Sequence, residues 1–98
     1  MGSSLKSASF LVESRLHDAA RGDCTACYDL GVAYSTGTSG VCFDLIEAHK
    51  WFNLAAIAGD EAAQAARAEI AGDMTAREIA MAQRAARDWL GINRAQAA

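Results

Sequence analysis

The chain has no proline, few aromatic side chains and no long apolar run. Without proline, no position is barred from a helix interior. The apolar runs are far shorter than the roughly 18 residues that read as a membrane-spanning helix, so the sequence predicts no membrane segment. A formal net charge of −3 is too close to neutral to indicate nucleic acid or an anionic membrane as the partner. The 98 residues are predicted to form one small domain, 1–98.

Cysteine is also sparse, with three residues in the chain. An odd number does not fit a disulfide framework and is typical of a reducing compartment. The apolar triplet 10–12 is followed at once by Glu13, which is not the pattern of a signal peptide. We therefore expect a cytoplasmic protein.

What the chain has in quantity is alanine, with 23 residues, together with other strong helix formers. Gly22-Asp23 and Gly59-Asp60 have the composition of a helix stop followed by a helix cap. The sequence therefore predicts an all-α fold of about five helices. These lie over 4–21, 24–36, 44–58, 60–71 and 75–90, with a frayed tail at 91–98.

Packing signals concentrate in the second and third predicted helices. Gly31 costs roughly 1 kcal/mol of helix propensity relative to alanine, which is best explained by close approach of another helix. Trp51 and Phe52 are predicted to fill the volume beside it. Gly37 and Gly40 mark the turn between the two helices.

A short sequence pattern occurs twice in the chain. The stop-and-cap pair at residues 22–23 recurs at residues 59–60, a spacing of 37 residues, and each pair is followed by an alanine at the same distance. A period in this range is typical of helical solenoids.

The stretch 26–59 resembles the Sel-one-like repeat (SLR) family, helix-turn-helix units related to tetratricopeptide repeats. The resemblance rests on Leu30-Gly31, Tyr34, the turn at 37–40 and the pair Trp51-Phe52. It implies a short right-handed αα solenoid with one full repeat. The repeat would span 23–59, an N-terminal cap helix 4–21, C-terminal cap helices 60–90 and a tail 91–98. It also implies an adaptor or scaffold that binds another protein or peptide, with no cofactor and no catalytic residues.

Candidate protein-binding residues follow from the second helix. If Leu30 and its stripe face the core, the opposite side carries Cys24, Tyr28, Gly31 and Ser35. A tyrosine that faces outward supplies contact area at low entropic cost. We therefore expect Tyr28, with Cys24 and Ser35, to contact the partner.

The first helix is apolar on more than one side, which indicates that it is covered twice. This predicts a homodimer, or a second protein, through the N-terminal helix. The apolar side chains are Leu5, Phe10, Leu11 and Val12.

A thiol site is the alternative function. Cys24 and Cys27 form a C-x-x-C at a helix N-terminus, where the helix dipole lowers the pKa of a thiol. A zinc site would need two more ligands, and Cys42, His49 and His17 are the other cysteines and histidines. No second metal-binding spacing accompanies the pair, so incidental thiols are favoured and no metal is predicted.

Catalysis is not indicated by any arrangement of residues. His17 and His49 lie on predicted helices with no carboxylate-serine or carboxylate-cysteine constellation nearby in the sequence. Asp44 is explained as a helix N-cap, with Glu47 as its reciprocal partner. We therefore expect the protein not to be an enzyme.

Overall fold

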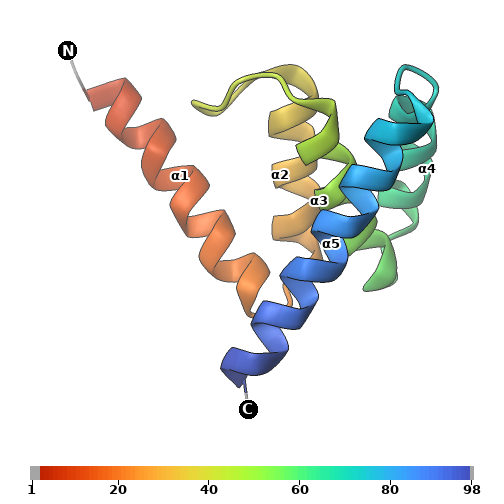
Figure 1. The fold of residues 1–98 in the computed structure, drawn as a ribbon. Helices are drawn as coiled ribbons and strands as arrows, with labels where there is room; N and C mark the ends of the chain where they lie inside the picture. Colours follow the sequence, from red (N-terminus) through yellow and green to blue (C-terminus); the bar gives the residue numbers. More distant parts are fainter. Residues whose placement is uncertain (1–2, 98) are drawn as a thin grey trace.

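The computed structural model describes the backbone of residues 3–97 and the side chains of residues 11–93. Within this range the chain forms five α-helices and no strand, so the all-α prediction is confirmed (Figure 1). The helices are α1 (Ser3–Ala20), α2 (Cys24–Thr36), α3 (Leu45–Ile57), α4 (Glu61–Ala71) and α5 (Ala76–Ala97).

Aspartate begins three of the helices, as predicted. The carboxylates of Asp23, Asp44 and Asp60 accept hydrogen bonds from backbone amides in the first turns of α2, α3 and α4. Gly22 and Gly59, which precede two of these caps, have φ of +91° and +102°. Because residues with a side chain rarely adopt such backbone angles, glycine is the residue that follows the ends of α1 and α3 here.

The expected reciprocal cap at α3 is wrong in one half. The Asp44 carboxylate accepts from the Glu47 amide at 3.2 Å, but the Asp44 amide donates to the Tyr34 carbonyl at 2.9 Å. The Glu47 carboxylate instead accepts from Lys50 Nζ at 3.3 Å and from Trp51 Nε1 at 3.2 Å. Since the end of α2 already supplies the acceptor, Glu47 is free to fix side chains of its own helix.

Helix α3 forms the centre of the fold. It packs against α2, α4 and α5, whereas α1 packs against α2. Leu30 and Trp51 are fully buried, and Phe52 is 2% exposed. A Cβ built on Gly31 would lie 2.5 Å from Cδ1 of Phe52, so the predicted close approach at this glycine is confirmed.

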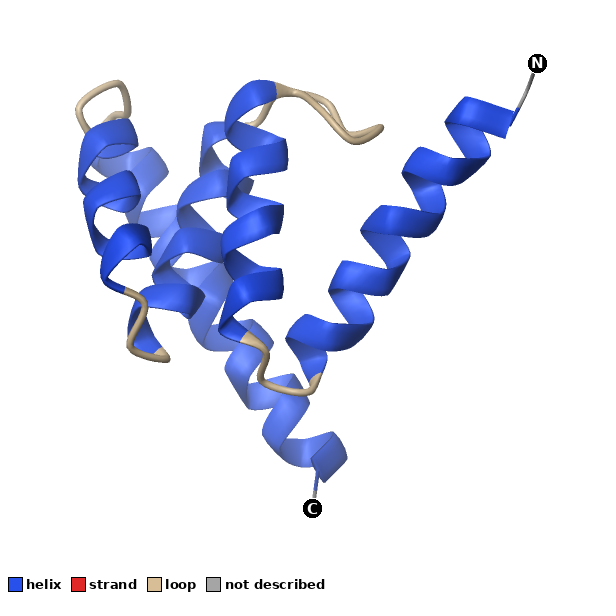
Figure 2. Cartoon of the chain, turned by 180° about the vertical axis from the view of Figure 1, so that it is seen from behind, coloured by secondary structure: helices blue, strands red, loops and turns tan. Residues whose placement is uncertain are grey.

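The first helix diverges from the others toward its N-terminal end, as two opposite views agree (Figures 1 and 2). Its C-terminal half packs on the core through Val12, Leu16 and the buried Ala19. Arg15 Nε lies 3.4 Å from a carboxylate oxygen of Asp29 on α2. The prediction that this helix is covered on two sides depends partly on Leu5 and Phe10, which lie outside the described side chains.

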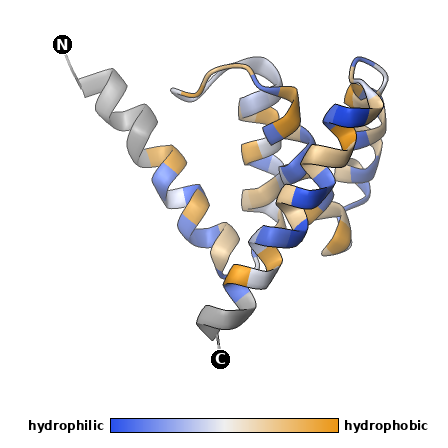
Figure 3. Cartoon of the chain, viewed as in Figure 1, coloured by the Kyte–Doolittle hydropathy of each residue, from blue (hydrophilic) through white to orange (hydrophobic). Residues whose placement is uncertain are grey.

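The last helix is longer than predicted. Thr75 and Glu78 form the expected capping box, with the Glu78 amide donating to Thr75 Oγ1 at 3.1 Å and the Thr75 amide to Glu78 Oε1 at 2.8 Å. However, α5 continues through Gly91 to Ala97, so the predicted tail at 91–98 is wrong over 91–97. Hydrophilic and hydrophobic segments alternate along α5 (Figure 3). Trp89 and Leu90 pack on the core directly before Gly91, and Asn93, two residues after it, lines a pocket, so α5 continues despite the propensity cost of the glycine.

Candidate functional site

Tyr28 does not face solvent as predicted. It is half-buried, and its ring centroid lies 5.5 Å from that of Phe52, with the ring planes at 54°. The reason is the covering helix: the side of α2 that carries Gly31 packs against α3, so Tyr28 borders the core there. This tyrosine contributes to helix packing, and the expectation of an outward contact residue is corrected.

The structure separates the other two predicted binding residues. Ser35 lies in the last turn of α2, where its hydroxyl donates to the Val32 carbonyl at 3.0 Å. Cys24 lies in the first turn, roughly 16 Å away along the helix axis. The predicted set Tyr28, Cys24 and Ser35 is thus spread along the length of α2, and its role in binding a partner stays a prediction.

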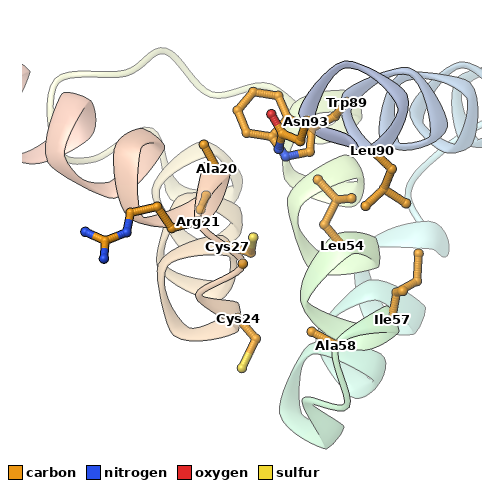
Figure 4. A pocket seen from close by; sticks show the side chains of 12 residues that line it. Ala20, Arg21, Cys24, Cys27, Leu54, Ile57, Ala58, Trp89, Leu90 and Asn93 are labelled. Atoms are coloured by element: carbon orange, nitrogen blue, oxygen red, sulfur yellow. The ribbon is translucent and has the colours of Figure 1, made fainter. Parts of the chain in front are cut away.

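Cys24 belongs to a pocket of about 310 Å³ at the end of the molecule where the turn between α1 and α2 meets α3 and α5 (Figure 4). The floor and walls come from segments far apart in the sequence. The lining residues are Ala19, Ala20, Arg21, Gly22, Cys24, Cys27, Leu54, Ile57, Ala58, Trp89, Leu90 and Asn93. We call this the α1/α3/α5 pocket.

The α1/α3/α5 pocket is mainly apolar. Leu54 is 5% exposed and belongs to the core, whereas Ile57 is 62% exposed. Arg21 and Asn93 supply the longer polar side chains of the lining. An apolar recess bordered by an exposed isoleucine and two polar side chains has the composition of a protein-binding or ligand-binding surface.

Sequence reasoning missed this pocket. The sequence feature that could have indicated the pocket is Ile57, a large apolar residue that directly follows the buried face of α3 and precedes the end of the helix. Asn93 had no such signal, because 91–98 was expected to be a tail, and the place of Trp89 and Leu90 depends on how α5 packs against α3.

The two cysteines of the C-x-x-C lie in different environments. Cys27 is buried, Cys24 is half-buried, and Cys42 is exposed in the loop between α2 and α3. Burial raises the pKa of Cys27 from 9.0 to about 11, with smaller contributions from Cys24 and Asp23. The helix N-terminus was expected to lower a thiol pKa here, and for Cys27 desolvation outweighs it.

The alternative zinc ligands are not brought together. Among the described residues, no three histidine, cysteine, aspartate or glutamate side chains are grouped as a metal site requires. Cys42 lies in the exposed loop, and His49 lies in the buried face of α3. The set Cys24, Cys27, Cys42 and His49 is therefore not a preformed four-ligand zinc site.

His49 is a buried polar residue that sequence reasoning left without a role. It is 3% exposed, and its Nδ1 has no hydrogen-bond partner. Burial lowers its pKa from 6.5, and the nearby Arg67 guanidinium lowers it further. Arg67 in turn donates to Asn53 Oδ1 at 2.6 Å. A neutral imidazole in the core is the arrangement that these neighbours favour.

Comparison with models of known protein families, with curated proteins and with solved structures finds no match to this chain. Among the described helices, none combines the length and apolarity needed to cross a membrane.

Proposed function

We propose that the chain is a non-catalytic protein-interaction module, an adaptor or scaffold unit of the SLR type that acts in the cytoplasm. The observation that carries the proposal is the α1/α3/α5 pocket with the exposed Ile57 in its lining. A recess of about 310 Å³ lies at the small end of the range for ligand sites. It suits one aliphatic or aromatic anchor side chain of a partner protein better than a whole cofactor.

The assignment to an SLR-type repeat has its own support. The sequence pattern that repeats after 37 residues corresponds to two copies of one local structure. Gly22-Asp23 and Gly59-Asp60 both pair a positive-φ glycine with a capping aspartate. Contacts between α1 and α2, α2 and α3, and α3 and α4 follow chain order, which is typical of a helical solenoid, whereas α5 packs on α3.

Photo-crosslinking tests the binding surface. A photoreactive side chain replaces Ile57 in one variant and Met81 in the other, since both are exposed, at 62% and 51%. Both variants are irradiated in extracts of the native host, and the adducts are identified by mass spectrometry. We expect a specific protein to be linked at Ile57 and absent at Met81. The same adducts at both positions would contradict a partner site at the pocket.

In the predicted homodimer, the protein that the chain binds is a second copy of itself. It has support in α1, which packs against α2 and carries Leu11 at 46% exposure. Light scattering after size-exclusion chromatography measures the mass directly. A dimer that Leu11→Glu converts to a monomer supports self-association through α1, and a strict monomer over the accessible concentrations contradicts it.

A further inference from the structure

We propose that Cys24 and Cys27 form a reversible dithiol–disulfide couple that a low-molecular-weight disulfide closes. Both residues lie in the first turn of α2, and both line the α1/α3/α5 pocket. The proposal concerns the thiols themselves and does not depend on the pocket holding a partner protein.

The spacing on the helix allows closure. Residues three apart in an α-helix have Cα atoms about 5 Å apart, within the range of roughly 4.4–6.8 Å that disulfides span. Their Cβ atoms are about 5–6 Å apart, somewhat farther than in a relaxed disulfide. The two sulfur atoms point in opposite directions in Figure 4, so both side chains must rotate. Closure therefore needs rotation and a shift of about 1 Å.

The first turn of a helix can supply that shift. The amides of Thr25 and Ala26 donate to the Asp23 carboxylate at 2.9 and 3.3 Å, and not to a preceding carbonyl. The Cys27 amide donates to the Asp23 carbonyl at 3.2 Å, the first backbone bond of the helix. A small adjustment here strains few backbone hydrogen bonds. The strain that remains makes the disulfide easy to reduce, as expected of a labile couple.

The two thiols have different parts in the reaction. Cys24 is half-buried and is the thiol that reagents reach first, whereas Cys27 is 6% exposed. The pKa of Cys27, raised to about 11, leaves about a hundredfold less thiolate at neutral pH than its ordinary value of 9.0 would. Cys24 is therefore the attacking thiol, and Cys27 resolves the intermediate.

The Cys24 thiolate attacks one sulfur of the small disulfide, whose other half leaves as a thiolate and takes up a proton. This leaves a mixed disulfide on Cys24. Cys27 then gives its proton to solvent, and its thiolate attacks the Cys24 sulfur and expels the second small thiol. Two protein thiols lose two electrons and two protons, and one small disulfide becomes two thiols. The mixed disulfide has no charge on Cys24, which removes one of the causes of the raised Cys27 pKa.

The test uses the full chain with Cys42→Ser, because Cys42 would otherwise confuse the count of thiols. The chain is equilibrated in buffers of reduced and oxidised glutathione and quenched in acid. Free thiols are then alkylated in denaturant and counted by intact mass. The matched variant is Cys42→Ser with Cys27→Ala, which preserves a small apolar residue at the buried position. Circular dichroism checks that both chains are folded.

We expect the Cys42→Ser chain to lose both thiols together, to lose the mass of two hydrogens, and to recover both thiols with a reductant. The chain that also carries Cys27→Ala should stop at a mixed disulfide on Cys24. In the folded Cys42→Ser chain, Cys24 should be alkylated at least about tenfold faster than Cys27. Equal accumulation of the mixed disulfide in both chains would overturn the proposal. Disulfide-linked dimers in place of the internal disulfide would also overturn it.

Discussion

Trp51 of α3 and Trp89 of α5 meet edge to face, with ring centroids 4.8 Å apart and ring planes at 73°. The Lys50 ammonium lies 4.5 Å from the Trp51 ring centroid and 5.5 Å from that of Trp89. The carboxylate of Glu47 accepts hydrogen bonds from both Lys50 and Trp51. Since Trp89 also lines the α1/α3/α5 pocket, this contact fixes one wall of the pocket to the central helix.

Replacing Trp89 should therefore weaken the fold. Trp89→Ala removes a partly buried ring and its contact with Trp51, and we expect a loss of about 2–4 kcal/mol in the free energy of unfolding. Urea denaturation followed by circular dichroism measures this loss. Arg87→Ala, at an exposed position of the same helix, should change it by less than about 0.5 kcal/mol. Equal losses would contradict the structural role of Trp89.

Two glycines within helices should respond to alanine in opposite directions. Gly31→Ala would place a methyl group against the Phe52 ring, and we expect a net loss of about 1–3 kcal/mol of stability. Gly91→Ala meets no atom within 4 Å, so it should gain about 0.5–1 kcal/mol from helix propensity. Thermal and urea unfolding of the pair measure the difference. Stabilisation by both substitutions would mean that α2 and α3 do not approach as closely as described.

His49 should make stability depend on pH below neutrality. Its pKa is lowered in the folded chain, so as pH falls through 6.5 the unfolded chain takes up a proton that the folded chain resists. The contribution is complete above that value and is lost as pH decreases, by at most about 1.4 kcal/mol per pH unit.

Urea unfolding between about pH 5 and about pH 7 tests this dependence. His49→Leu should flatten the curve relative to the wild type, at little cost in stability because its Nδ1 has no hydrogen-bond partner to lose. An unchanged slope in His49→Leu would show that the imidazole is not buried neutral.

The capping box of α5 should contribute measurably. Thr75→Ala removes the acceptor for the Glu78 amide, and we expect a loss of about 1 kcal/mol. Asp73→Ala, two residues earlier and exposed, serves as the matched control and should change stability by less than about 0.5 kcal/mol. If Asp73→Ala costs as much as Thr75→Ala, the helix start is stabilised by charge near its N-terminus and not by this cap.

Local sequence patterns predicted more of the fold than of the candidate site. Caps at Asp23 and Asp60 and the close contact at Gly31 were predictable because each depends on neighbours within one or two helices. The burial of Tyr28 was not, since it depends on how Phe52 of another helix is placed. The α1/α3/α5 pocket combines four segments, so its lining depends on how distant helices pack, and its residue Asn93 lies in a stretch that was expected to be a tail.

The partner protein identified by crosslinking at Ile57 is purified on its own. The measurement that tests the central proposal most directly is its affinity for three chains: wild type, Ile57→Glu and Met81→Glu. Both substitutions place a carboxylate at an exposed apolar position, so neither should unfold the chain. We expect Ile57→Glu to weaken binding by at least about tenfold, or 1.4 kcal/mol, and Met81→Glu to leave it within about twofold. Equal affinity of all three chains would contradict a protein-interaction module that acts through this pocket.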